Sequence, residues 1–142
     1  LVTPGNHDAP YLAWAERIGG RSALIARTRA NFVVIADWVA ASDWAGFLAE
    51  NPAMCSTTSV CLKFRDPWFS ARSDAVRQEI AKQLAALLEQ EGVGLDIGSY
   101  RDAPPGLRIW CGATIETTDV AALLPWLDWA YGEVKARNQK AA

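Results

Sequence analysis

The stretch LRIWCGA, residues 107–113, decides the fold that this sequence predicts, because its residues alternate in character. Successive side chains of a strand point to opposite faces, so we expect a strand with one apolar face against helices. The opposite face carries a cation and an indole. It is poorly suited to a buried core but could form one side of a binding site for a polar ligand. The two alternating sets are Leu107, Ile109 and Cys111 on the first face and Arg108, Trp110 and Gly112 on the second.

Two further segments are predicted to complete a small sheet. The run TTSVCLKF, residues 57–64, is β-branched and alternating, with Val60, Leu62 and Phe64 facing one side. The run VGLDIGSY, residues 93–100, is predicted as a short strand, and the loop RDAPPG separates it from residues 107–113.

Helices are predicted over residues 10–18, 22–41, 73–90 and 117–136, with a break at Gly19-Gly20 and a kink or interruption at Pro125. Their buried faces should follow the three- and four-residue spacing of apolar side chains. The predicted stripes are Leu24, Thr28, Phe32, Ile35, Ala36 and Val39, then Val76, Ile80, Leu84, Leu87 and Leu88, and finally Val120, Leu124, Leu127, Tyr131 and Val134.

The order α-α-β-α-β-β-α predicts an α+β domain, with a small, mostly antiparallel three-stranded sheet and helices packed on one face. A chain of 142 residues fits one domain. We assign it to residues 10–136, between a loose N-terminal arm over residues 1–9 and a frayed tail over residues 137–142.

Composition argues against several functional classes. The 14 basic residues are spread along a chain of net charge -2, so no basic stripe indicates a nucleic-acid partner. Cys55, Cys61 and Cys111 have no metal-site spacing, and we interpret them as small buried thiols of a protein in a reducing cytoplasm. No apolar run reaches the roughly 20 residues that span a membrane, and no signal peptide is visible.

No residue of this sequence is predicted to be catalytic, to bind a cofactor or to bind a metal. His7, the only histidine, lies in the arm and has no positioned partner for acid–base work. The acids Asp96, Asp102, Glu116 and Asp119 form no evident pair and are interpreted as caps or solvated side chains. Motifs for a nucleophilic serine, a dinucleotide or a nucleoside triphosphate are absent from the sequence.

Two arginines are the remaining candidates for a binding site. A guanidinium offers planar, bidentate donors that match a carboxylate or a phosphate. Pro104, Pro105 and Gly106 stiffen the loop between Arg101 and Arg108, which lowers the entropic cost of holding both cations near one anion. The alternatives are that Arg108 pairs with an internal acid, or that both arginines are solvated.

At these residues the sequence resembles a known family. The segments WAERIGG, TTSVCLKF and above all DIGSYRDAPPGLRIWCGATIE resemble the C-terminal part of phosphoserine aminotransferase, over about residues 11–135. The resemblance is to the α-proteobacterial-type branch, within the class V pyridoxal-phosphate aminotransferases. It implies the small domain of a fold-type I enzyme, which closes over substrate.

The resemblance implies transfer of an amino group between glutamate and 3-phosphohydroxypyruvate in serine biosynthesis. By position, Arg108 resembles the arginine that binds the substrate α-carboxylate, and Arg101 the arginine near the substrate phosphate or side-chain carboxylate. Many family members have histidine where this chain has Tyr100, and the loop that carries Arg101 is longer here by about one residue.

The resemblance also implies a homodimer whose pyridoxal phosphate is bound to a lysine of a large N-terminal domain. None of Lys63, Lys82, Lys135 and Lys140 has the sequence context of that lysine. We therefore expect that the large domain is missing and that this chain alone is inactive. The alternative is a free-standing module that binds small anions or amino acids without catalysis.

Overall fold

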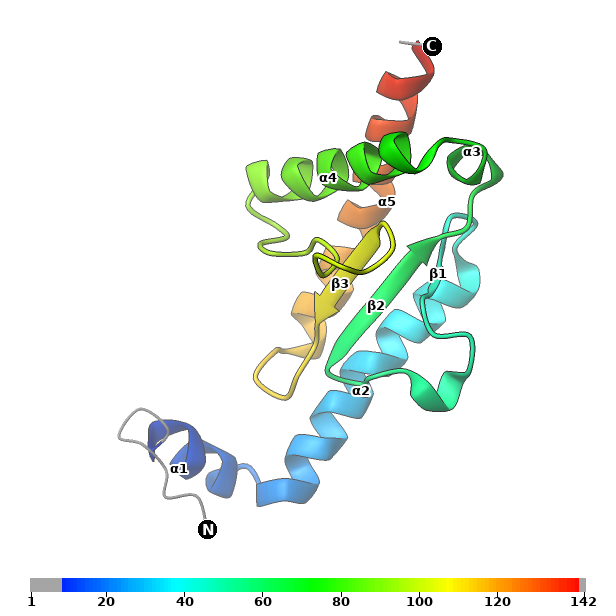
Figure 1. Ribbon diagram of the computed structural model, residues 1–142. Helices are drawn as coiled ribbons and strands as arrows, with labels where there is room; N and C mark the ends of the chain where they lie inside the picture. Colours follow the sequence, from blue (N-terminus) through cyan, green and yellow to red (C-terminus); the bar gives the residue numbers. More distant parts are fainter. Residues whose placement is uncertain (1–8, 141–142) are drawn as a thin grey trace.

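The computed structural model describes residues 9–140, and Figure 1 shows their arrangement. His7 and most of the predicted arm lie outside the described residues. The elements in chain order are α1 (Ala9–Arg17), α2 (Gly20–Ala41), β1 (Ala45–Phe47), the 3₁₀ turn η1 (Pro52–Met54), β2 (Ser59–Phe64), α3 (Pro67–Ser70), α4 (Asp74–Gln90), β3 (Gly106–Trp110) and α5 (Thr117–Lys140).

The sheet is three-stranded and antiparallel, in the order β1-β2-β3. The alternation predicted for β2 is confirmed, because Val60, Leu62 and Phe64 are buried and the residues between them are half-buried. In β3, Leu107 and Ile109 are buried in the same way, and Leu62 pairs with Leu107 across the two strands. The predicted α+β class with a three-stranded antiparallel sheet is therefore confirmed.

The strand predicted over residues 93–100 is wrong, and the third strand is β1. The 93–100 segment is joined to β3 by an isolated bridge between Gly98 and Leu107 and by the hydrogen bond from the Arg108 amide to the Ile97 carbonyl, and it forms no strand of its own. Asp96 has a φ of 51°, which is incompatible with an extended chain. The order α-α-β-α-β-β-α is corrected accordingly, with β1 after α2 and the short α3 before α4.

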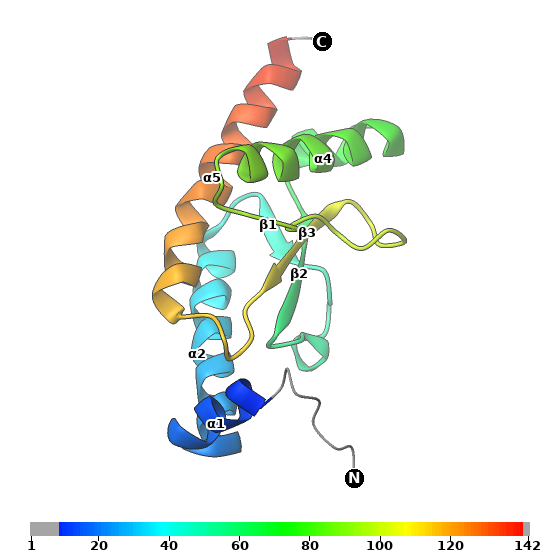
Figure 2. The same cartoon turned by 90° about the vertical axis from the view of Figure 1, so that its left-hand side faces the viewer.

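The helices α2 and α5 pack against each other and lie on one face of the sheet, while α4 crosses α5 near the end of the sheet (Figure 2). The stripe predicted for α5 is buried throughout, from Val120 to Val134. The stripe of α4 is wrong at Val76, which is 41% exposed, because the buried face begins at Ile80 and includes Ala81.

The last helix is longer than predicted and is not interrupted at Pro125. It continues to Lys140, so residues 137–140 of the predicted tail are helical. The side chain of Asn138 donates to Gln83 Oε1 at 2.9 Å, which connects this last turn to α4. Pro125 lies on an exposed side of the helix, where water can reach the carbonyl that proline leaves unbonded.

Asn31 is a buried polar residue of α2 that the apolar stripe does not include. Its Nδ2 donates to the carbonyls of Cys111, Gly112 and Ile115 at 3.1, 3.3 and 3.0 Å. Its Oδ1 accepts from the Thr117 hydroxyl at 2.7 Å. One side chain therefore joins α2 to the segment between β3 and α5.

Gly106 is required where β3 begins beside β2. A Cβ at this position would lie 2.1 Å from the Leu62 carbonyl oxygen, which is too close for any side chain.

We predict that Gly106→Ala lowers the free energy of unfolding by about 1–3 kcal/mol in urea denaturation, as overpacking does. Gly132→Ala is the matched control, because no atom beyond its chain neighbours and the backbone of its own helix lies within 4 Å of its added Cβ. It should raise stability by about 0.5–1 kcal/mol inside α5, and equal effects of the two substitutions would contradict the packing.

Asp66 holds α3 against α5 through three donors. Its carboxylate accepts from the Trp68 amide at 2.8 Å, the Tyr131 hydroxyl at 2.9 Å and Lys135 Nζ at 2.5 Å. Burial acts to raise the pKa of Asp66, but the hydrogen bonds from Lys135, Trp68 and Tyr131 together lower that pKa below its ordinary value.

A carboxyl group whose pKa is lowered by folding stabilises the protein when ionised. The contribution of Asp66 should be fully present above the unfolded-state pKa of about 3.9, and lost as pH falls through the lower folded-state pKa. We predict that the urea midpoint of the wild type falls more steeply on acidification than that of Asp66→Asn. The exposed Asp43→Asn should retain the wild-type pH profile. Parallel profiles for the wild type and Asp66→Asn would refute this role.

Candidate functional site

Arg108 lies on the face of β3 that points away from α2 and α5. It is paired across the strands with Cys61 of β2, and its side chain is 17% exposed. Trp110 follows on the same face and is 55% exposed. The prediction that Arg108 and Trp110 share the face opposite the core agrees with this burial pattern.

The partner of Arg108 in this structure is Asp96. Its Nη2 donates to Asp96 Oδ2 at 2.6 Å and to the Asp96 carbonyl at 3.2 Å. The guanidinium carbon lies 4.8 Å from the centre of the Tyr100 ring, and its Nε is buried without a hydrogen-bond partner. The hydrogen bond to Asp96 raises the pKa of Arg108, against the lowering effect of burial. The structure thus shows the alternative in which Arg108 pairs with an internal acid.

The backbone around Asp96 explains how this acid reaches a residue twelve positions later. The left-handed turn at Asp96 directs both its carbonyl and its carboxylate to one nitrogen of Arg108. The next residue, Ile97, is buried, and its carbonyl accepts from the Arg108 amide at 2.9 Å. Asp96 was interpreted from sequence as a cap or a solvated acid, and that interpretation misses its pairing.

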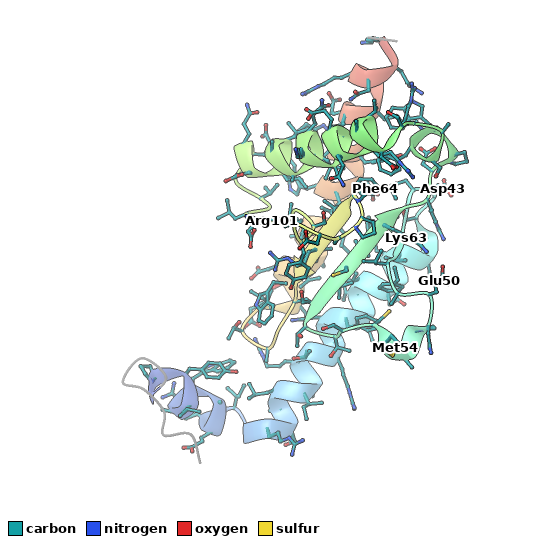
Figure 3. All side chains as sticks on the ribbon, in the orientation of Figure 1. Asp43, Glu50, Met54, Lys63, Phe64 and Arg101 are labelled. Atoms are coloured by element: carbon teal, nitrogen blue, oxygen red, sulfur yellow. The ribbon has the colours of Figure 1, made fainter. Side chains whose placement is uncertain are left out.

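Arg101 lies in the loop beside α4, as Figure 3 shows, and its side chain is exposed. It lines a pocket of about 390 Å³ together with Lys82 of α4, Ser99 and Tyr100. Arg108 is not among the residues that line this pocket. Arg101 and Lys82 therefore lie together in this pocket. The stiff loop led us to expect Arg101 and Arg108 near one anion, and the pocket does not bring these two arginines together.

Tyr100 lies between the two arginines. Its ring covers the Arg108 guanidinium, its hydroxyl lies 3.5 Å from Ser59 Oγ, and it also lines the Arg101 pocket. Sequence reasoning named Tyr100 only as a departure from a family pattern. An aromatic residue directly before an arginine in a loop was the available signal, but it does not specify which cation the ring covers.

A second pocket, of about 570 Å³, lies at the far end of β3. Trp110, Gly112 and Thr58 line it together with Tyr11 of α1 and Ile25 of α2. A Cβ at Gly112 would lie 2.7 Å from the Trp110 indole, so the glycine makes room for the ring. This pocket is mostly apolar and contains exposed aromatic surface.

Neither Lys82 nor Lys135 is placed to hold pyridoxal phosphate. The protein groups that hold this cofactor include a lysine and a partner for the ring nitrogen. Lys135 is already paired with Asp66, and Lys82 is exposed in a pocket whose lining residues include no carboxylate. Among residues 9–140, no group of three or more His, Cys, Asp or Glu side chains is placed to bind a metal ion.

The comparisons with known proteins identify the relationship. The chain is 48% identical over 124 residues to the phosphoserine aminotransferases of Methanosarcina mazei and Methanosarcina barkeri.

The chain is homologous to part of phosphoserine aminotransferase. The match covers 87% of this chain but 31% of each relative. The chain therefore spans about a third of the length of the phosphoserine aminotransferases that it matches. No protein-family model matches the chain.

Solved structures of phosphoserine aminotransferase have the same fold. One, from a study of radiation damage to the Schiff base of that enzyme, matches with a TM-score of 0.67 and 16% identity, over 85% of this chain and 30% of the other. The enzyme of Bacillus circulans subsp. alkalophilus matches with a TM-score of 0.66 and 18% identity, over the same shares. None of the helices described for this chain is both long and apolar enough to cross a membrane.

Proposed function

We propose that this chain is the C-terminal, substrate-closing domain of a phosphoserine aminotransferase of the α-proteobacterial type. The complete enzyme would transfer an amino group between glutamate and 3-phosphohydroxypyruvate to make phosphoserine in the cytoplasm. The observation that carries the proposal is the 48% identity, which extends over 87% of this chain.

The rest of the enzyme would be a large N-terminal domain that binds pyridoxal phosphate, in a homodimer. The proposal is supported by the 31% coverage of each relative and by exposed apolar side chains. Tyr11, Ile25 and Trp110 are 42%, 40% and 55% exposed and line the 570 Å³ pocket. Contacts between domains of one chain commonly bury about 600–1,500 Å², which a surface of this kind can supply.

In this proposal the chain binds and orients substrate. Arg108 would grip the α-carboxylate, because its guanidinium offers a bidentate match. Asp96 occupies Arg108 in this structure, and a substrate carboxylate would have to displace its side chain, which is 89% exposed. Arg101 would meet the phosphate or side-chain carboxylate, with Lys82 as a second cation in its pocket. The cofactor, when bound, supplies the electron sink for amino transfer.

The role of Arg108 predicts a specific kinetic defect in the complete enzyme. Arg108→Lys keeps the charge but loses the planar pair of donors, so KM for glutamate should rise by about tenfold or more. Cofactor absorbance should not change, because the chain's described residues do not hold the cofactor. Arg137→Lys is the matched control, since Arg137 makes only an exposed pair with Glu133. A wild-type KM for Arg108→Lys would remove Arg108 from the substrate site.

If the cofactor is held by the rest of the enzyme, the 142-residue chain should not transaminate alone. We expect no phosphoserine from glutamate and 3-phosphohydroxypyruvate, with or without added pyridoxal phosphate. A dye for exposed apolar surface should bind the chain, and size-exclusion chromatography should detect association through that surface. Turnover by the purified chain would disprove the proposal.

A free-standing module for small anions or amino acids is the alternative. It is favoured by the Arg101 and Lys82 pocket, which is formed within this chain. This alternative predicts a monomer that binds phosphoserine by calorimetry and does not bind the dye. Arg101→Gln should then abolish phosphoserine binding.

A further inference from the structure

We propose that Asp96 is an internal competitor of substrate, which occupies Arg108 until a ligand carboxylate displaces it. This inference rests on the proposed role of Arg108 in binding the substrate α-carboxylate. It adds a residue that sets the affinity and selectivity of that site.

The contact between Asp96 and Arg108 uses only part of the guanidinium. Two oxygens of Asp96 meet the same nitrogen, Nη2, at 2.6 and 3.2 Å. The neighbouring Nε is buried and has no hydrogen-bond partner. A carboxylate that placed one oxygen on Nη1 and the other on Nη2 would engage two nitrogens, which is the stronger arrangement, without needing the buried Nε. Asp96 is therefore an incomplete occupant of a site that a bidentate ligand fills better.

The side chain of Asp96 is free to leave while its backbone stays in place. The side chain is 89% exposed, so turning it into water costs little desolvation or packing. The adjoining Ile97 is 4% exposed and bonds the Arg108 amide, which anchors the segment to β3. The displacement is thus a local rotation of one side chain, without rearrangement of the sheet.

Arg108 itself stays positioned after Asp96 leaves. The Tyr100 ring lies 4.8 Å from the guanidinium carbon and covers one of its faces. The side chain is 17% exposed, so the strand and the 96–100 segment limit its rotamers. Asp96 thereby sets a minimum binding strength that a ligand must exceed. An anion that makes a single hydrogen bond to Arg108 binds no more strongly than Asp96, whereas a bidentate carboxylate binds more strongly.

The test is the affinity for glutamate of the complete enzyme that contains this chain, measured by isothermal titration calorimetry, because binding by the isolated chain is what the free-standing module predicts. Asp96→Asn should tighten glutamate binding about two- to fivefold, because the lost ion pair no longer competes. Asparagine tolerates the left-handed conformation at this position, so the fold should persist, as circular dichroism can check. Asp96→Gly, which removes the side chain altogether, should tighten binding at least as much.

Asp102→Asn is the matched control, because Asp102 is an exposed acid of the same loop region. It should change glutamate affinity by less than Asp96→Asn, since its effect is that of net charge alone. Equal tightening by both variants would overturn the proposal in favour of a general charge effect. Unchanged or weaker binding by Asp96→Asn and Asp96→Gly would also overturn it.

Arg108→Lys separates this inference from the proposed function. If Arg108→Lys abolishes glutamate binding while the Asp96 variants do not tighten it, only the competitor role fails. If Arg108→Lys leaves binding unchanged, Arg108 is not the carboxylate site, and both the proposed role and the competitor role fail. The absence of measurable binding by the wild type and by both Asp96 variants would overturn the inference for this chain.

Discussion

One buried amide, that of Asn31, is the constraint on which the placement of the candidate site depends. Asn31 is fully buried in α2, and its four hydrogen bonds reach the segment that follows β3 and the first residue of α5. Buried carbonyls left without such a donor cost about 1–3 kcal/mol each. Because the segment after β3 is fixed in this way, the register of β3 is fixed as well, with Leu107 and Ile109 buried and Arg108 and Trp110 on the opposite face of the strand.

The parts of this fold that can be predicted from sequence are those that depend only on the regular spacing of apolar residues. Alternation over residues 57–64 and 107–113 identifies two strands and the correct faces, and the spacing from Val120 to Val134 identifies the core side of α5. The strand β1 could not be predicted this way, because three residues are too few to show a period. Val93, Leu95 and Ile97 alternate with other residues in the 93–100 segment, but the left-handed conformation of Asp96 breaks the strand. The burial of Asn31 was not predicted, because a polar residue within a helical pattern is expected to be solvated.

The candidate site, like the fold, could be predicted from sequence only where it depends on the residue pattern and not where it depends on tertiary contacts. Arg108 and its face follow from alternation, and the family follows from the resemblance over residues 11–135, which the 48% identity to phosphoserine aminotransferases supports. The partner of Arg108 does not follow from either, because its position depends on the φ of one residue twelve positions earlier. The grouping of Arg101 with Lys82 depends on how α4 crosses the loop, and no local signal in the sequence specifies that crossing.

The segment around Ile97 limits how copies of the molecule can associate through their sheets. The strand β3 lies at the rim of the sheet, where unpaired backbone groups invite another chain to add a strand. The bond from the Arg108 amide to Ile97 and the bridge between Gly98 and Leu107 already occupy the middle of that rim. At the opposite rim, β1 is only three residues long. Intermolecular sheet growth, the usual first step toward fibrils, therefore has little template on either side of this domain.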